Sequence, residues 1–104
     1  MNKFIAIVIT AMFLAGIVNA AEFEVGQKNK QFTKDKLTIK VGDSVKFTNQ
    51  DPFFHNIFSL SELKTFDLGS YPKGEFRTVT FDQPGTLDVE CAIHPNMHMV
   101  IEVE

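Results

Sequence analysis

The fold class is decided by a short stretch of sequence, which reads Leu37-Thr38-Ile39-Lys40-Val41-Gly42-Asp43-Ser44-Val45-Lys46-Phe47-Thr48. Apolar and polar side chains alternate on both sides of a Gly-Asp-Ser turn, which is the period of two half-buried strands. Strand-like runs bounded by turn residues follow at residues 57–60, 75–81, 87–91 and 100–104. Strands at this spacing predict an all-β protein built as a β-sandwich.

The rest of the sequence contains little helical signal. The only helix candidate is one turn over residues 61–66, where Ser61 is a suitable N-cap. Residues 64–74 include two glycines and a proline and are predicted to form a loop. The chain has no internal repeat, and its length of 104 residues is that of one domain with an N-terminal extension.

Residues 1–20 have the layout of a Sec-type secretory signal peptide. A positively charged start is followed by an apolar run and then by the small-residue cleavage site Val18-Asn19-Ala20. The apolar run has about 15 residues, fewer than the ~20 that a spanning helix needs. We therefore expect cleavage before Ala21 and a periplasmic domain of residues 21–104 that is not held in the membrane.

Composition narrows the range of partners and raises a question about the single cysteine. The chain has 10 basic and 13 acidic residues with no basic stripe, so a nucleic-acid partner is not expected.

A domain this small is marginally stable without a disulfide or a metal. Cys91 has no second cysteine to pair with. In an exported chain it would therefore be a free thiol, an intermolecular bridge or a metal ligand.

The residue types that bind soft metals gather in one segment, which reads Cys91-Ala92-Ile93-His94-Pro95-Asn96-Met97-His98-Met99. Taken singly, the Cys and each Met are typical of core packing and each His of a surface position. The C-x2-H-x2-M spacing at the end of a predicted strand favours a shared metal instead. Thiolate, imidazole and thioether suit copper, whereas structural zinc prefers Cys and His alone.

A second histidine must come from elsewhere in the chain. Of the three histidines, only His55 is remote from this segment, and it follows a predicted strand and a turn. A sandwich can bring it to the same end as Cys91. Two His, one Cys and a weak axial Met form the electron-transfer type of copper site.

At these residues the chain resembles the cupredoxins, the blue-copper family of plastocyanin, pseudoazurin and amicyanin. Residues 85–97 resemble the amicyanin-type G-T-x-D-x-x-C-x-x-H-P-x-M loop, and Val41-Gly42-Asp43-Ser44-Val45 with His55-Asn56-Ile57 resembles the segment around the family's first histidine. Residues 66–75 resemble, more loosely, the small cupredoxin-like proteins labelled as methylamine-utilisation or copper-tolerance proteins. The resemblance implies a Greek-key β-sandwich with one type 1 copper ion at one end.

The resemblance also implies a role for particular residues. His55 and His94 would be the imidazole ligands and Cys91 the thiolate, with Asn56 fastening the two ligand loops. Met97 is the preferred axial ligand, because aligning Val103 with the family's last core valine places it there. Met99 is the alternative, at the longer spacing of plastocyanin.

The predicted function is one-electron transport with copper cycling between Cu(I) and Cu(II). The protein would be a monomer that meets a redox partner transiently, with Phe53, Phe54, Pro95 and Asn96 surrounding an exposed edge of His94. The alternative is a periplasmic protein that sequesters or shuttles copper, receiving it from a donor or passing it to an acceptor, to which His98 would add a ligand. An enzyme is not expected, because four protein ligands leave no open coordination position.

Overall fold

The computed structural model describes residues 19–104, so nearly all of the predicted signal peptide lies outside the described residues. This part of the chain forms strands and contains no helix, hence none long and apolar enough to cross a membrane. The strands are β1 (Glu22–Lys28), β2 (Gln31–Phe32), β3 (Lys36–Ile39), β4 (Ser44–Asn49), β5 (His55–Ser59), β6 (Phe66–Tyr71), β7 (Phe76–Thr80), β8 (Gly85–Glu90) and β9 (His98–Val103).

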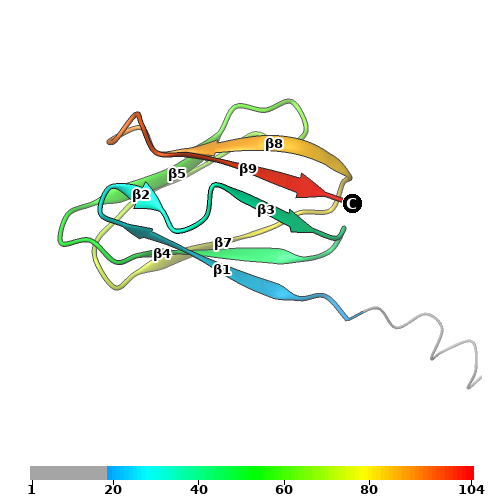
Figure 1. Ribbon diagram of the computed structural model, residues 1–104, viewed down its shortest axis with the longest axis horizontal. Helices are drawn as coiled ribbons and strands as arrows, with labels where there is room; N and C mark the ends of the chain where they lie inside the picture. Colours follow the sequence, from blue (N-terminus) through cyan, green and yellow to red (C-terminus); the bar gives the residue numbers. More distant parts are fainter. Residues whose placement is uncertain (1–18) are drawn as a thin grey trace, which may run out of the picture.

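The strands form two mixed sheets that face each other (Figure 1). One sheet has the order β2-β1-β4-β7 and the other has the order β3-β9-β8-β5-β6. The β1–β4 and β3–β9 pairs are parallel, and the other neighbours are antiparallel. The predicted all-β sandwich is confirmed.

Alternation along the strands builds the core between the sheets. The side chains of Val45 and Phe47 on β4 are fully buried, and Leu87 and Val89 on β8 face them from the other sheet with at most 1% exposure. Fully burying such a side chain stabilises the fold by about 1.5–3 kcal/mol. The remaining apolar core residues are Val25, Phe32, Leu37, Ile39, Ile57, Tyr71, Val79, Phe81, Cys91, Met97, Met99, Ile101 and Val103.

Two local predictions are wrong. The turn at residues 61–66 is not helical, and the predicted loop at 64–74 contains strand β6. β6 is the edge strand of its sheet, and the alternation of Phe66 and Leu68 with Asp67 is interrupted at Gly69-Ser70, two residues that are typical of turns. Gly69 within it adopts φ 74°, a backbone conformation that glycine adopts without strain.

The strands β1 and β2 also lie outside the predicted set. β1 is an inner strand, but its buried stretch Val25-Gly26-Gln27 contains a glycine and an amide. Neither residue signals a strand. Their burial depends on contacts with β4, β5 and β6 that are far away in the sequence.

The two ends of the sandwich differ. At one end, the Asp43 carboxylate accepts the N–H groups of Ala21 and Lys40, both at 2.9 Å. These bonds lower the pKa of Asp43 and fasten the start of β1 to the β3–β4 turn. At the other end, the β1–β2 turn, the β4–β5 connection and the β8–β9 loop gather (Figure 1).

Two phenylalanines on neighbouring strands test this core assignment. Phe47 is fully buried and packs edge-to-face on Phe32 at 6.3 Å, whereas Phe76 is 50% exposed. We expect Phe47→Ala to lower the free energy of unfolding by about 3–5 kcal/mol. Phe76→Ala should cost less than about 1 kcal/mol, because it removes only a surface contact with Lys46.

Urea-induced unfolding of both variants, with the same metal content as the wild type, measures the two losses. Equal losses would contradict the core described above.

Candidate metal centre

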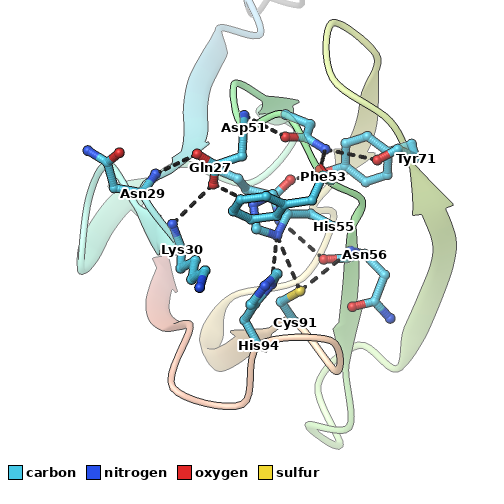
Figure 2. Close-up of polar contacts among 11 residues, drawn as sticks. Gln27, Asn29, Lys30, Asp51, Phe53, His55, Asn56, Tyr71, Cys91 and His94 are labelled. Carbon is cyan, nitrogen blue, oxygen red and sulfur yellow. Dashed lines mark hydrogen bonds and ion pairs between the residues drawn. The ribbon is translucent and has the colours of Figure 1, made fainter.

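Three potential ligand atoms converge at the end of the sandwich where the loops gather. Cys91 directly follows β8, His94 lies in the β8–β9 loop, and His55 begins β5. Their ligand atoms all lie within 4.8 Å of one another, and Figure 2 shows the three side chains pointing toward a common centre. The Nδ1 atom of His55 is 3.2 Å from Nδ1 of His94 and 3.7 Å from Sγ of Cys91. The structure thus brings together the three residues that the sequence analysis assigns to one metal, although His55 lies 36 residues before Cys91 in the chain.

Asn56 joins the two segments that carry these side chains. Its backbone N–H points at the Cys91 sulfur at 3.5 Å, and its side-chain oxygen accepts the N–H of Ala92 at 2.7 Å. Hydrogen bonds to sulfur lower the electron density of a thiolate and hold its direction. Asn56 therefore lies where the resemblance places the residue that fastens the ligand loops.

The two imidazole rings share an aromatic neighbour. The Phe53 ring lies 5.3 Å from the His55 ring and 5.1 Å from the His94 ring. His55 is fully buried, whereas His94 keeps part of its surface exposed. Burial lowers the pKa of His94, and the neighbouring His55 ring and Lys30 ammonium lower it further. The neutral ring, which is the form that binds metals, is thereby favoured.

Strand register distinguishes the two candidate methionines. In the β8–β9 ladder Leu87 pairs with Ile101 and Val89 pairs with Met99. Continuing the same antiparallel register by one inward-facing pair sets Cys91 opposite Met97. Met97 is thus level with the cysteine, whereas Met99 lies two residues, or about 7 Å, deeper in the sandwich. Both side chains are buried, at 1% and 0% exposure.

His98 lies apart from these residues. It begins β9 on the outward face, where its side chain is 49% exposed and its Nε2 atom is 2.8 Å from the Asp88 carboxylate. Because side chains alternate along a strand, His98 points away from both neighbouring methionines. The sequence Met97-His98-Met99 therefore does not form one cluster of ligands.

Asp51 is a site residue that the sequence did not single out. Its carboxylate is 4% exposed and its Oδ2 atom lies 2.7 Å from His55 Nε2 (Figure 2). The same carboxylate accepts the N–H groups of Asn29 at 2.7 Å and Lys30 at 3.0 Å. Burial by itself raises the pKa of Asp51, but the hydrogen bonds from His55, Lys30 and Asn29 outweigh it and the pKa is lowered. The only sequence signal was a carboxylate four residues before a candidate ligand, within what reads as a turn.

A further set of buried polar side chains surrounds the β4–β5 connection. The Asn49 amide donates to the carbonyls of Phe53 at 2.8 Å and Tyr71 at 2.9 Å, and its oxygen accepts the Asp51 N–H at 2.8 Å. The Tyr71 hydroxyl donates to the Gln27 side chain, whose amide donates in turn to the Asn56 carbonyl at 3.2 Å. Among the described residues no buried side-chain polar atom lacks a partner. The connection that carries His55 is therefore held by hydrogen bonds on both sides.

Comparison with known proteins agrees with this geometry. The family of copper binding proteins described as the plastocyanin/azurin family matches residues 19–104. A methionine-to-alanine mutant of amicyanin with Cu(I) is 25% identical, with a TM-score of 0.75 over 86% of this chain and 88% of that chain. A reduced tryptophan-to-tyrosine mutant of amicyanin is 26% identical, with the same TM-score and coverage. A search of the curated proteins finds no significant match.

A larger protein also contains a similar unit. The Cu-containing nitrite reductase (NirK) from Thermus scotoductus SA-01 is 26% identical, with a TM-score of 0.75 over 84% of this chain. That match covers only 23% of the nitrite reductase chain. The same fold therefore also occurs within an enzyme.

Fold and site together define a cupredoxin, a β-sandwich with a copper site at one end. The chain belongs to the plastocyanin/azurin family of copper-binding proteins. Its cofactor is one copper ion, and the residues present fit that ion. The buried Cys91 Sγ, the Nδ1 atoms of His55 and His94, and the Met97 thioether level with the sulfur form the soft and borderline donor set that copper prefers.

Proposed function

We propose that the protein is an exported one-electron carrier whose copper is held by His55, Cys91, His94 and Met97. The observation that carries this proposal is the convergence of three fixed donor atoms in a site where two of the three side chains are at most 1% exposed. When bound, copper supplies a one-electron Cu(I)/Cu(II) couple. The protein holds the donors in one arrangement, which suits a carrier because little has to move when the charge changes.

The choice of Met97 as the residue that would supply the fourth ligand rests on its register. Met97 is level with Cys91, and its backbone N–H bonds to the His94 carbonyl at 2.9 Å, which closes the ligand loop. Met99 is packed next to Val89 as part of the core. We therefore propose Met97 as the weak ligand and Met99 as a core residue.

Copper sequestration or shuttling is the second candidate. A protein that hands over metal needs ligands that an acceptor can reach. Here the His55 and Cys91 side chains are buried, and the extra histidine, His98, is engaged by Asp88 on the outer face. These features favour electron transport over copper transfer.

We also propose that this chain is not itself an enzyme. Three strong donors and one thioether from the protein leave no position for a substrate, which catalysis at a metal ordinarily requires. The resemblance to part of a nitrite reductase concerns a sandwich unit that makes up less than a quarter of that chain.

The partial exposure of His94 supports a docking patch around it. Phe54 and Ile93 flank the site with 53% and 46% of their surface exposed, and Pro95 and Asn96 in the same loop are exposed as well. Exposed apolar side chains around the one ligand that reaches the surface suit the small interfaces of transient redox complexes. The electron would leave through His94.

Export also belongs to this proposal. The predicted cleavage precedes Ala21, whose nitrogen lies 2.9 Å from the Asp43 carboxylate. Cleavage there would convert an amide hydrogen bond into an ion pair, so that the new N-terminus is held at the start of β1. We infer that the periplasmic protein begins at Ala21 and stays soluble and monomeric.

The ligand set predicts an optical signature. The copper-loaded protein should show an intense thiolate-to-copper charge-transfer band, and Cys91→Ser should abolish it. Met97→Leu should keep the band but raise the reduction potential and change the EPR spectrum, because only the weak ligand is lost. Met99→Leu should affect stability alone, by less than about 1.5 kcal/mol. A folded, copper-loaded wild type without the band would refute the site.

The docking patch predicts a charge effect on electron transfer. Ile93→Lys should slow electron self-exchange between Cu(I) and Cu(II) copies by about tenfold, since like charges then face each other in the encounter. NMR line broadening in mixed samples measures this rate. Leu60→Lys is the matched control, because it adds the same charge at a residue that is 73% exposed and lies at the far end of β5. Equal rates in the two variants would contradict the patch.

Export predicts a defined N-terminus. Expression of the full chain in a bacterium with a Sec pathway should yield a periplasmic protein whose intact mass corresponds to residues 21–104. A full-length product that stays with the membrane fraction would contradict both cleavage and release. The measurement needs no copper, so it is independent of the site.

A further inference from the structure

A buried carboxylate lies directly behind one of the proposed copper ligands. The ring of His55 uses Nδ1 to face Cys91 and His94, and its other nitrogen, Nε2, lies 2.7 Å from Asp51 (Figure 2). The two ring nitrogens thus have separate partners. A carboxylate accepts hydrogen bonds but does not donate them when ionised, so Nε2 must carry the proton in this contact. Nδ1 is then left with its lone pair toward the site.

The carboxylate is itself held in place by the neighbouring hairpin. Asn29 and Lys30 form the turn between β1 and β2 with φ angles of 56° and 59°. This left-handed turn directs both of their N–H groups at Asp51, one to each carboxylate oxygen. A lysine in this region is strained, and charge-assisted hydrogen bonds to a buried carboxylate offset that strain. The hairpin therefore fixes Asp51, and Asp51 fixes the ring.

The negative charge of Asp51, directly behind His55, also affects which oxidation state of a bound copper ion is favoured. The Asp51 carboxylate is nearly inaccessible to water, so its field is weakly screened. Through the imidazole it makes Nδ1 a stronger donor, which stabilises the more highly charged ion. It therefore favours Cu(II) over Cu(I).

We propose that Asp51 is a positioning residue for copper that orients His55 and lowers the reduction potential of the site. The proposal rests on the function proposed above, in which His55 is a ligand. It assigns the β1–β2 turn a role in setting that potential, although the turn itself contributes no ligand.

The test compares Asp51→Asn with the wild-type copper protein. Asparagine removes the charge. Its NH2 group, which is a hydrogen-bond donor, would also face another donor, either His55 Nε2–H or a backbone N–H. Cu(II) affinity, measured by competition with a chelator, should fall about 10–100-fold. Cu(I) affinity should fall less. Each tenfold excess in the Cu(II) loss corresponds to a rise of about 59 mV in reduction potential.

Asp43→Asn is the matched control. Asp43 is also buried and also accepts a hydrogen bond from one main-chain nitrogen on each carboxylate oxygen, but it lies at the opposite end of the sandwich. Both variants should unfold at lower temperature, but only Asp51→Asn should change Cu(II) affinity and potential. If its potential equals that of Asp43→Asn, the proposal is wrong. The charge-transfer band of the wild type reports on the proposed function separately, so the two failures are distinguishable.

A measurement on the wild type covers the case in which Asp51→Asn does not fold. Nitrogen-15 NMR of the Cu(I) protein should show His55 protonated at Nε2, with that proton shifted downfield and slow to exchange. An Nε2 proton that exchanges as fast as that of the exposed His98 would overturn the proposal.

Discussion

The hydrogen bonds of Asn56 connect two strands that the chain keeps far apart, and the metal centre depends on them. His55 starts β5 and Cys91 directly follows β8, and these strands share only a short ladder around Phe58 and Glu90. Near the site, the contact is made by Asn56 instead, through its N–H to the Cys91 sulfur and its oxygen to the Ala92 N–H. A rigid sandwich alone would bring the two segments to the same end, but it would not set the distance between an imidazole and a thiolate. A polar side chain buried at the junction does so.

The sequence reveals the parts of the fold whose burial is decided by alternation. Strands β3, β4, β7, β8 and β9 each place apolar residues on one face, so their period is visible without knowing their partners. Strand β1 is different, because Gln27 can be buried there only if its side-chain amide is hydrogen-bonded. Tyr71 and Asn56, which lie on other strands, supply those hydrogen bonds. Strand β6 is different again, since its alternation of Phe66 and Leu68 with Asp67 is interrupted at Gly69-Ser70. In β1 the decisive contacts are distant in the chain and no local pattern encodes them, whereas in β6 the turn residues hide a short alternating pattern.

The residues of the candidate site likewise fall into those that the sequence reveals and those that only the structure shows. Cys91 and His94 are visible from their spacing, and His55 follows from counting histidines. The preference for Met97 over Met99 could be stated from the sequence, but its physical reason lies in the β8–β9 register. Asp51 was not predicted, because its partners are a ring nitrogen and two turn amides whose left-handed backbone cannot be read from Asn29-Lys30 alone. A carboxylate in a polar turn ordinarily faces solvent, and only the tertiary structure shows it to be buried.

Rigidity at the site bears on the choice between the two candidate functions. The β4–β5 connection is held from one side by Asp51 and the hairpin, and from the other by Asn49, Gln27 and Tyr71. To release copper, a protein must move at least one strong ligand away from the others. Here moving His55 or Cys91 would break several buried hydrogen bonds at once, and each broken bond leaves a polar group without water. Passing an electron requires none of these bonds to break. The arrangement therefore opposes metal transfer while leaving electron transfer unhindered, and this asymmetry is the strongest structural reason to favour a carrier.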